Sequence, residues 1–124
     1  MTDIAPTGRA GRLSIAHSTV DGIRVVTLRG DIDHDVKDAL TTALLPQDDA
    51  DDGPAPRVVA DLSGVTFLDS TGINVFVHVH HRVSAAQGWL RLAAAREPVT
   101  RLFQIVGLDT VIACPPTLEQ ALNP

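Results

Sequence analysis

The chain has 124 residues, a formal net charge of −5 at pH 7 and 44% hydrophobic residues, which suits one globular domain with its own core. The acidic balance and the 3% aromatic content argue against nucleic acid and anionic membranes as partners, because those surfaces attract cationic side chains and single strands also need stacking rings. The single cysteine, Cys114, cannot form an intrachain disulfide and fits a reducing compartment.

The N-terminal segment lacks the pattern of a signal peptide, and no apolar run is long enough to cross a bilayer. We therefore expect a soluble cytoplasmic protein that does not bind a membrane. We expect residues 1–11 to be a flexible leader and residues 12–124 to form the domain. Cys114 lies in an apolar run, so we expect a buried small hydrophobe rather than a reactive thiol.

Two strands are predicted first. Leu13–Ile15 alternates between apolar and polar residues, and Ile23–Leu28 is rich in β-branched residues. The pair Asp21–Gly22 between them predicts a hairpin turn, and Gly30 is expected to end the second strand.

A helix is predicted between Asp33, a suitable N-cap, and Pro46, which stops it. Residues 46–56 follow as an acidic loop, in which four aspartates lie at 48–52. The loop does not match a calcium-binding EF-hand, because Val59 stands where that pattern needs a glutamate. One apolar stripe marks the buried face of the helix: Val36, Ala39, Leu40, Ala43 and Leu44.

The apolar run Arg57–Leu62 predicts a central parallel strand, followed by a short hydrophobic loop. Ile73–Val83 fits both a strand and a helix. We predict a helix, because Trp89–Ala93 resembles a parallel neighbour that a crossover connection must reach. Gly88 stands where a glycine often follows a helix end.

The last third predicts a helix from Pro98 to Gly107, a short strand at Val111–Ala113 and a brief helix capped by Thr117 and Gln120. The predicted order is ββαβαβαβα, an α/β domain with a mixed sheet flanked by about four helices. The expected buried stripe of the Pro98 helix is Val99, Leu102, Phe103 and Val106.

The segment Asp69-Ser70-Thr71-Gly72 opens the middle helix. A hydroxyl at a helix start faces backbone N–H groups and the positive end of the dipole, so a phosphate could be accommodated there. Serine is also an ordinary N-cap residue. From these residues alone, capping and phosphorylation of Ser70 both stay open.

No catalytic constellation is visible, and we expect neither enzyme activity nor a cofactor. The sequence contains no GxSxG, GxGxxG, Walker A or HExxH motif. His78, His80 and His81 lack a Cys, Asp or Glu at helical spacing to complete a metal site, so we interpret them as a polar helix face.

The run Asp61-Leu62-Ser63-x-Val65-x-Phe67-Leu68-Asp69-Ser70-Thr71-Gly72 resembles the STAS domain family, specifically its anti-sigma factor antagonists. Gly30-Asp31-Ile32-Asp33 is similar to the Gly-Glu-Leu-Asp of that family. Arg101-Leu102-Phe103 with Gly107-Leu108 is similar to its late helix. The resemblance extends over roughly Leu13–Leu122.

This resemblance implies a partner-switching role. The unphosphorylated protein would bind a serine kinase that is also an anti-sigma factor, and would thereby free a sigma factor. The kinase would then phosphorylate Ser70 and release the complex, and a metal-dependent serine phosphatase would reset it. Phosphorylation would add nearly two negative charges beside Asp69 and near Asp33.

The resemblance implies a partner-binding set of Asp33, Asp69, Ser70, Thr71 and Gly72. Ser70 is the expected phosphate acceptor, and Thr71 is the rival acceptor in the same turn. Asp69 is an acidic neighbour, Gly72 is a small residue that allows close approach, and Asp33 is explained equally well as a helix cap. We expect a monomer when the protein is free.

The alternative is a STAS module that works without phosphorylation, as a sensor of a small ligand or lipid or as an accessory subunit of a transporter. Two features depart from the family pattern: Asn74 with the histidines at 78–81, and the acidic insertion at 48–52.

Overall fold

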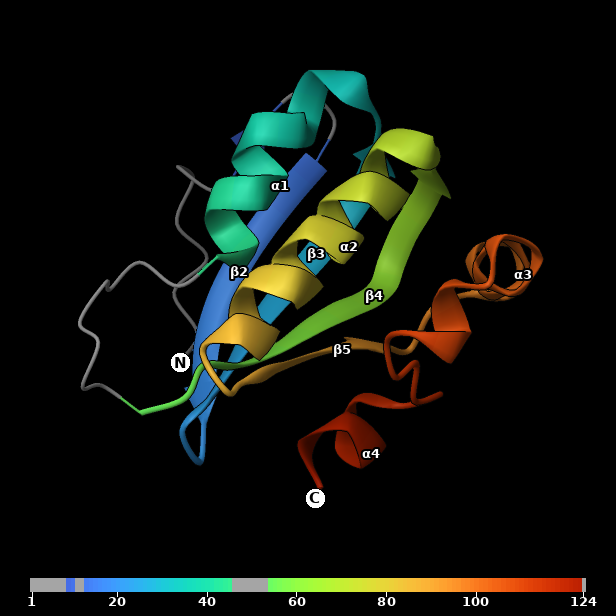
Figure 1. The fold of residues 1–124 in the computed structure, drawn as a ribbon. Helices are drawn as coiled ribbons and strands as arrows, with labels where there is room; N and C mark the ends of the chain where they lie inside the picture. The colour runs from blue at the N-terminus through green and yellow to red at the C-terminus, as the bar shows by residue number, and fades with distance from the viewer. Residues whose placement is uncertain (1–8, 11–12, 46–53, 124) are drawn as a thin grey trace.

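The computed structural model describes residues 9–10, 13–45 and 54–123, which form a sheet with helices on both of its faces (Figure 1). The strands are β1 (Arg9–Ala10), β2 (Leu13–Val20), β3 (Ile23–Ile32), β4 (Arg57–Leu68) and β5 (Trp89–Ala93). The helices are η2 (His34–Val36), α1 (Lys37–Leu44), α2 (Ser70–Ala85), α3 (Glu97–Val106), η3 (Leu108–Thr110) and α4 (Leu118–Leu122).

The sheet is mixed, as predicted, and its strands lie in the order β1-β2-β3-β4-β5. β2 and β3 form an antiparallel hairpin, whereas β3, β4 and β5 run parallel to one another. The hairpin turn lies at the predicted residues, where Asp21 and Gly22 have φ values of 52° and 80°. Two positive φ values suit a tight turn that matches the twist of the strands.

Two hydrophobic cores lie on opposite faces of the sheet, because successive strand side chains point to opposite sides. α1 and α2 cover one face and bury the larger core with it (Figure 1). α4 closes the smaller core over the other face. The smaller core consists of Ile23, Val25, Val59, Ala93 and Ala121.

The predicted helices at Asp33, in the ambiguous 73–83 segment and at Thr117 are confirmed. Asp33 accepts a hydrogen bond from the Asp35 N–H at 3.0 Å, and Thr117 accepts one from the Gln120 N–H at 3.1 Å. The 3-10 turn η2 precedes α1, which ends at Leu44, before Pro46. Its predicted stripe is buried, with Ala39 only partly covered.

The predicted ends of the two central strands were wrong. β3 continues past Gly30 to Ile32, and β4 continues through the expected loop to Leu68. The two strands stay paired after irregularities at Thr27/Arg29 and Gly30/Asp31. Gly64 allows this pairing, since a Cβ there would lie 2.6 Å from the Arg29 Cγ.

Two predictions in the last third need correction. The strand predicted at Val111–Ala113 is a single parallel bridge between Arg91 and Ala113, and the prolines that follow cannot donate to a longer ladder. Val106 is 51% exposed rather than buried, because the α3 residues that reach the core are Val99 and Phe103.

The expected leader 1–11 is described only at Arg9–Ala10, which pair with β2. The rest of that segment and residues 46–53 of the acidic loop lie outside the described residues.

The end of α2 also differs from the prediction. The residue with left-handed geometry is Gln87, with φ of 66°, and not Gly88. The Gln87 N–H bonds Ser84 O and the Gly88 N–H bonds Val83 O, at 3.0 and 2.8 Å, which is the Schellman pattern. Gly88 is required for space, because a Cβ there would lie 1.8 Å from Pro56 O.

Gly88→Ala is expected to lower the free energy of unfolding by about 3 kcal/mol, because backbone must move to admit the methyl group. The matched control is Gly107→Ala, where φ is 77° but the nearest atom lies 4.0 Å away. That control is expected to cost about 1 kcal/mol from backbone strain alone. Urea unfolding of both variants measures the difference, and equal losses would contradict the steric explanation.

Arg91 holds the C-terminal helix against the sheet. Its guanidinium donates to the Ala121 and Asn123 carbonyls at 2.8 and 2.9 Å and lies 3.8 Å from the centroid of the Trp89 ring. Arg91→Ala is therefore expected to cost about 1–2 kcal/mol and to change the emission of Trp89, the single tryptophan. Arg101→Ala removes only an exposed ion pair to Glu97, so we expect it to change stability by less than about 0.5 kcal/mol. If both variants unfold like the wild type, Arg91 does not anchor α4.

Candidate functional site

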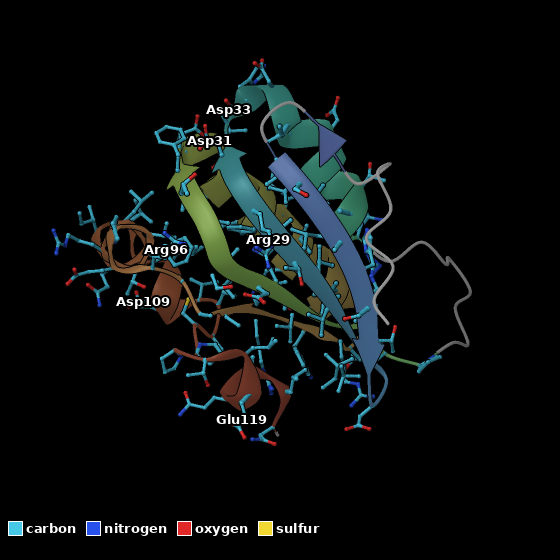
Figure 2. All side chains as sticks on the ribbon, turned by 180° about the vertical axis from the view of Figure 1, so that it is seen from behind. Arg29, Asp31, Asp33, Arg96, Asp109 and Glu119 are labelled. Carbon is cyan, nitrogen blue, oxygen red and sulfur yellow. The ribbon has the colours of Figure 1, made fainter. Side chains whose placement is uncertain are left out.

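The predicted site lies at the edge of the sheet where β3 and β4 end. Ile32 and Leu68 are register partners, and Asp33 and Asp69 follow them directly. The Asp69 N–H also donates to Ile32 O at 3.2 Å. Both helices that follow these strands start at this edge (Figure 1), and Figure 2 shows Asp33 there beside Asp31. The parallel pairing therefore brings the two predicted acidic residues together.

Asp69, and not Ser70, is the N-cap of α2. The Asp69 Oδ1 accepts from the Thr71 N–H at 2.9 Å, and its carbonyl accepts from Gly72 and Ile73 at 3.1 and 3.3 Å. The expectation that the Ser70 hydroxyl faces free backbone N–H groups is therefore corrected. Most donors of the first turn are already satisfied by Asp69.

Ser70 is the first helical residue and its side chain is exposed. Its hydroxyl makes no hydrogen bond with any residue that the structure describes. Thr71, the rival acceptor, is half-buried. Ser70 is thus the more accessible of the two hydroxyls and is not needed to cap the helix.

Gly72 is buried, and the close approach that it allows is between α2 and the sheet of the same domain. A Cβ at this position would lie 2.8 Å from the Ile32 Cγ2 and 3.0 Å from the Leu68 Cγ. The missing side chain lets the first turn of α2 rest on the last residues of β3 and β4. The close packing at Gly72 therefore determines where Ser70 lies relative to the sheet.

Two further residues at this edge were not singled out from the sequence. Phe67 is 50% exposed, whereas the next residue of the strand, Leu68, is buried. Thr66 donates its hydroxyl hydrogen to the Asp31 Oδ1 at 2.8 Å across the two strands. Phe67 was noted only as part of the motif that resembles the STAS family. Because residues 63–68 were predicted as a loop, the direction of these two side chains could not be predicted.

The histidines of α2 and Cys114 lie in the part of the chain that the structure describes. That part of the chain holds no group of three His, Cys, Asp or Glu side chains placed to bind a metal ion. His78 and His81 are exposed on α2, and His80 is half-buried. Burial, with a smaller effect of Asp109, raises the pKa of the Cys114 thiol to about 11, so the thiolate needed for reactivity is scarce at neutral pH.

Two other groups with shifted pKa values lie away from this edge, near the far end of α1. Arg24 donates to the carbonyls of Ala43 and Leu45, and its partial burial lowers its pKa. Burial and then the charge of Arg24 lower the pKa of His17. Neither group belongs to the candidate site.

A model of the STAS domain matches residues 14–121. The anti-sigma-B factor antagonist of Bacillus subtilis is 36% identical over 87 residues, which are 70% of this chain and 76% of that protein. No described helix has the length and apolar character required to span a bilayer.

Solved structures give the same result. An anti-sigma factor antagonist from Mycobacterium paratuberculosis has 30% identity and a TM-score of 0.74, covering 89% of this chain and 91% of that one. SpoIIAA, an anti-sigma factor antagonist solved in its unphosphorylated form, has the same fold at 21% identity, with a TM-score of 0.66 and coverage of 88% and 93%. The chain belongs to the STAS domain family, and the relatives named above are anti-sigma factor antagonists.

Proposed function

We propose that this protein is an anti-sigma factor antagonist whose binding is switched by phosphorylation of Ser70. When Ser70 is unmodified, the protein binds an ATP-dependent serine kinase that is also an anti-sigma factor, and a sigma factor is freed. Phosphorylation ends the complex, and a serine phosphatase restores the antagonist. The protein acts by binding rather than by catalysis, as a monomer in the cytoplasm.

One observation carries the proposal: Ser70 is exposed while Asp69 caps the helix. A kinase needs an acceptor hydroxyl that it can reach, and a reversible switch needs a modification that leaves the fold intact. Modification of a serine that capped the helix would cost about 1 kcal/mol or more of stability. Because Asp69 provides the cap, modification of Ser70 leaves those bonds in place.

The acidic surroundings of Ser70 supply the force that ends the complex. A phosphate would add nearly two negative charges next to Asp69 and at the same edge as Asp33. Few N–H groups remain in the first turn of α2 to neutralise it, since Asp69 accepts from three of them. Like charges held across a desolvated interface cost several kcal/mol, which weakens binding more than about a hundredfold.

Intact-mass spectrometry tests the acceptor. The protein is incubated with ATP, Mg²⁺ and each purified candidate serine kinase of its host. We expect the wild type and Thr71→Ala to gain one phosphate and Ser70→Ala to gain none, because Ser70 is the exposed hydroxyl. A phosphate that persists in Ser70→Ala and disappears in Thr71→Ala would make Thr71 the acceptor. No gain with any kinase would favour the STAS module that works without phosphorylation.

Calorimetric titration against the kinase that modifies the protein tests the switch. Ser70→Ala is expected to bind within a few-fold of the wild type, and the phosphorylated wild type more than about a hundredfold more weakly. Asp69→Asn keeps a capping side chain and removes one charge, so phosphorylation should weaken its binding less. Equal binding of the phosphorylated and unphosphorylated wild type would refute the charge mechanism.

A further inference from the structure

Phe67 is exposed although it is a large aromatic residue in a chain that has only three phenylalanines. The other two, Phe76 and Phe103, are 0% and 1% exposed, and their rings pack edge to face in the core with centroids 6.2 Å apart. Phe67 is 50% exposed. Burial of an aromatic side chain contributes more stabilising free energy than burial of most other residues. An exposed ring can still contribute that free energy when a partner protein covers it.

The position of Phe67 connects it with the candidate site. Only Leu68 and Asp69 separate it from Ser70, so their Cα atoms are at most about 11 Å apart. A standard interface covers about 800 Å² on each partner, which corresponds to a disc of roughly 16 Å radius. A protein that covers Ser70 therefore has room to cover Phe67 as well.

Three aspartates lie close to Phe67 along the two strands. Its register partner on β3 is Asp31, and Asp33 and Asp69 follow the ends of the same two strands. Asp33 and Asp69 each use one carboxylate oxygen to accept a backbone N–H. Their remaining lone pairs can accept charge-assisted hydrogen bonds from a cationic side chain.

We propose that Phe67 is the apolar anchor of the interface with the kinase, and that the partner surface is an apolar pocket rimmed by arginine or lysine. An aromatic side chain at the centre with polar pairs around it is the usual arrangement of an interface hot spot. This inference rests on the proposed function, because it names a further residue of the same contact. Phe67 positions the complex and does not take part in phosphate transfer.

The test measures affinity for the kinase that phosphorylates the wild type, using unphosphorylated protein and the kinase with ADP. Phe67→Ala is expected to bind roughly 30-fold more weakly or worse, as truncation of a hot-spot aromatic does. Phe67→Leu should recover part of the loss by filling the same pocket. The matched control is Ile105→Ala, an apolar truncation at a residue of α3 that is 75% exposed, which we expect to change the affinity less than twofold.

The kinetics of Ser70 phosphorylation give a second test of the anchor. A misfolded variant would not show the pattern expected for a lost anchor. Phe67→Ala should raise the KM for Ser70 phosphorylation and leave kcat nearly unchanged, because an anchor binds ground state and transition state equally. Its circular dichroism and thermal unfolding should match those of the wild type, since the ring is not part of the core.

If Phe67→Ala binds the kinase with wild-type affinity, Phe67 is not the anchor, and the proposed function is unaffected. An equal loss in Ile105→Ala would also overturn the anchor, because the contact would then not be specific to this edge. A wild-type protein that neither binds nor is phosphorylated by any candidate kinase would overturn the proposed function and the anchor together.

Discussion

The parallel pairing of β3 with β4 is the contact on which the rest of the structure depends. It continues through the bulges to Ile32 and Leu68, so both strands end at the same edge of the sheet. The chain enters a helix directly after each strand, and each helix begins with an aspartate cap. Two caps, an exposed serine and an exposed phenylalanine therefore meet at one place, although they come from segments far apart in the sequence.

Space at this edge is controlled by residues that have no side chain. Gly64 lets Arg29 of β3 lie across β4, and Gly72 lets α2 start close to Ile32 and Leu68. A methyl group at Gly72 would push the start of α2 away from the sheet and would move Ser70 with it. The placement of the hydroxyl is thus a result of backbone packing rather than of hydrogen bonds made by the hydroxyl itself.

The sequence predicted the features that local chemistry determines. The Asp21–Gly22 turn, the Asp33 cap, the α1 stripe and the end of α3 at Gly107 all depend on residues within a few positions of one another. The features that it missed depend on distant contacts. The extension of β4 needs β3 as its partner, and the exposure of Val106 depends on where α3 meets the core. The choice between Asp69 and Ser70 as cap depends on where β4 ends, because both residue types cap helices well.

The cap formed by Asp69 has a consequence for how the proposed switch would respond. The bonds at the start of α2 are complete before any modification, so phosphorylation of Ser70 would not need to rearrange them. A switch that acts through local charge alone adds no conformational equilibrium of its own to the circuit. The fraction of active molecules would then follow the ratio of kinase to phosphatase activity in a graded way, and any sharp or delayed response of the circuit would have to arise in the partners.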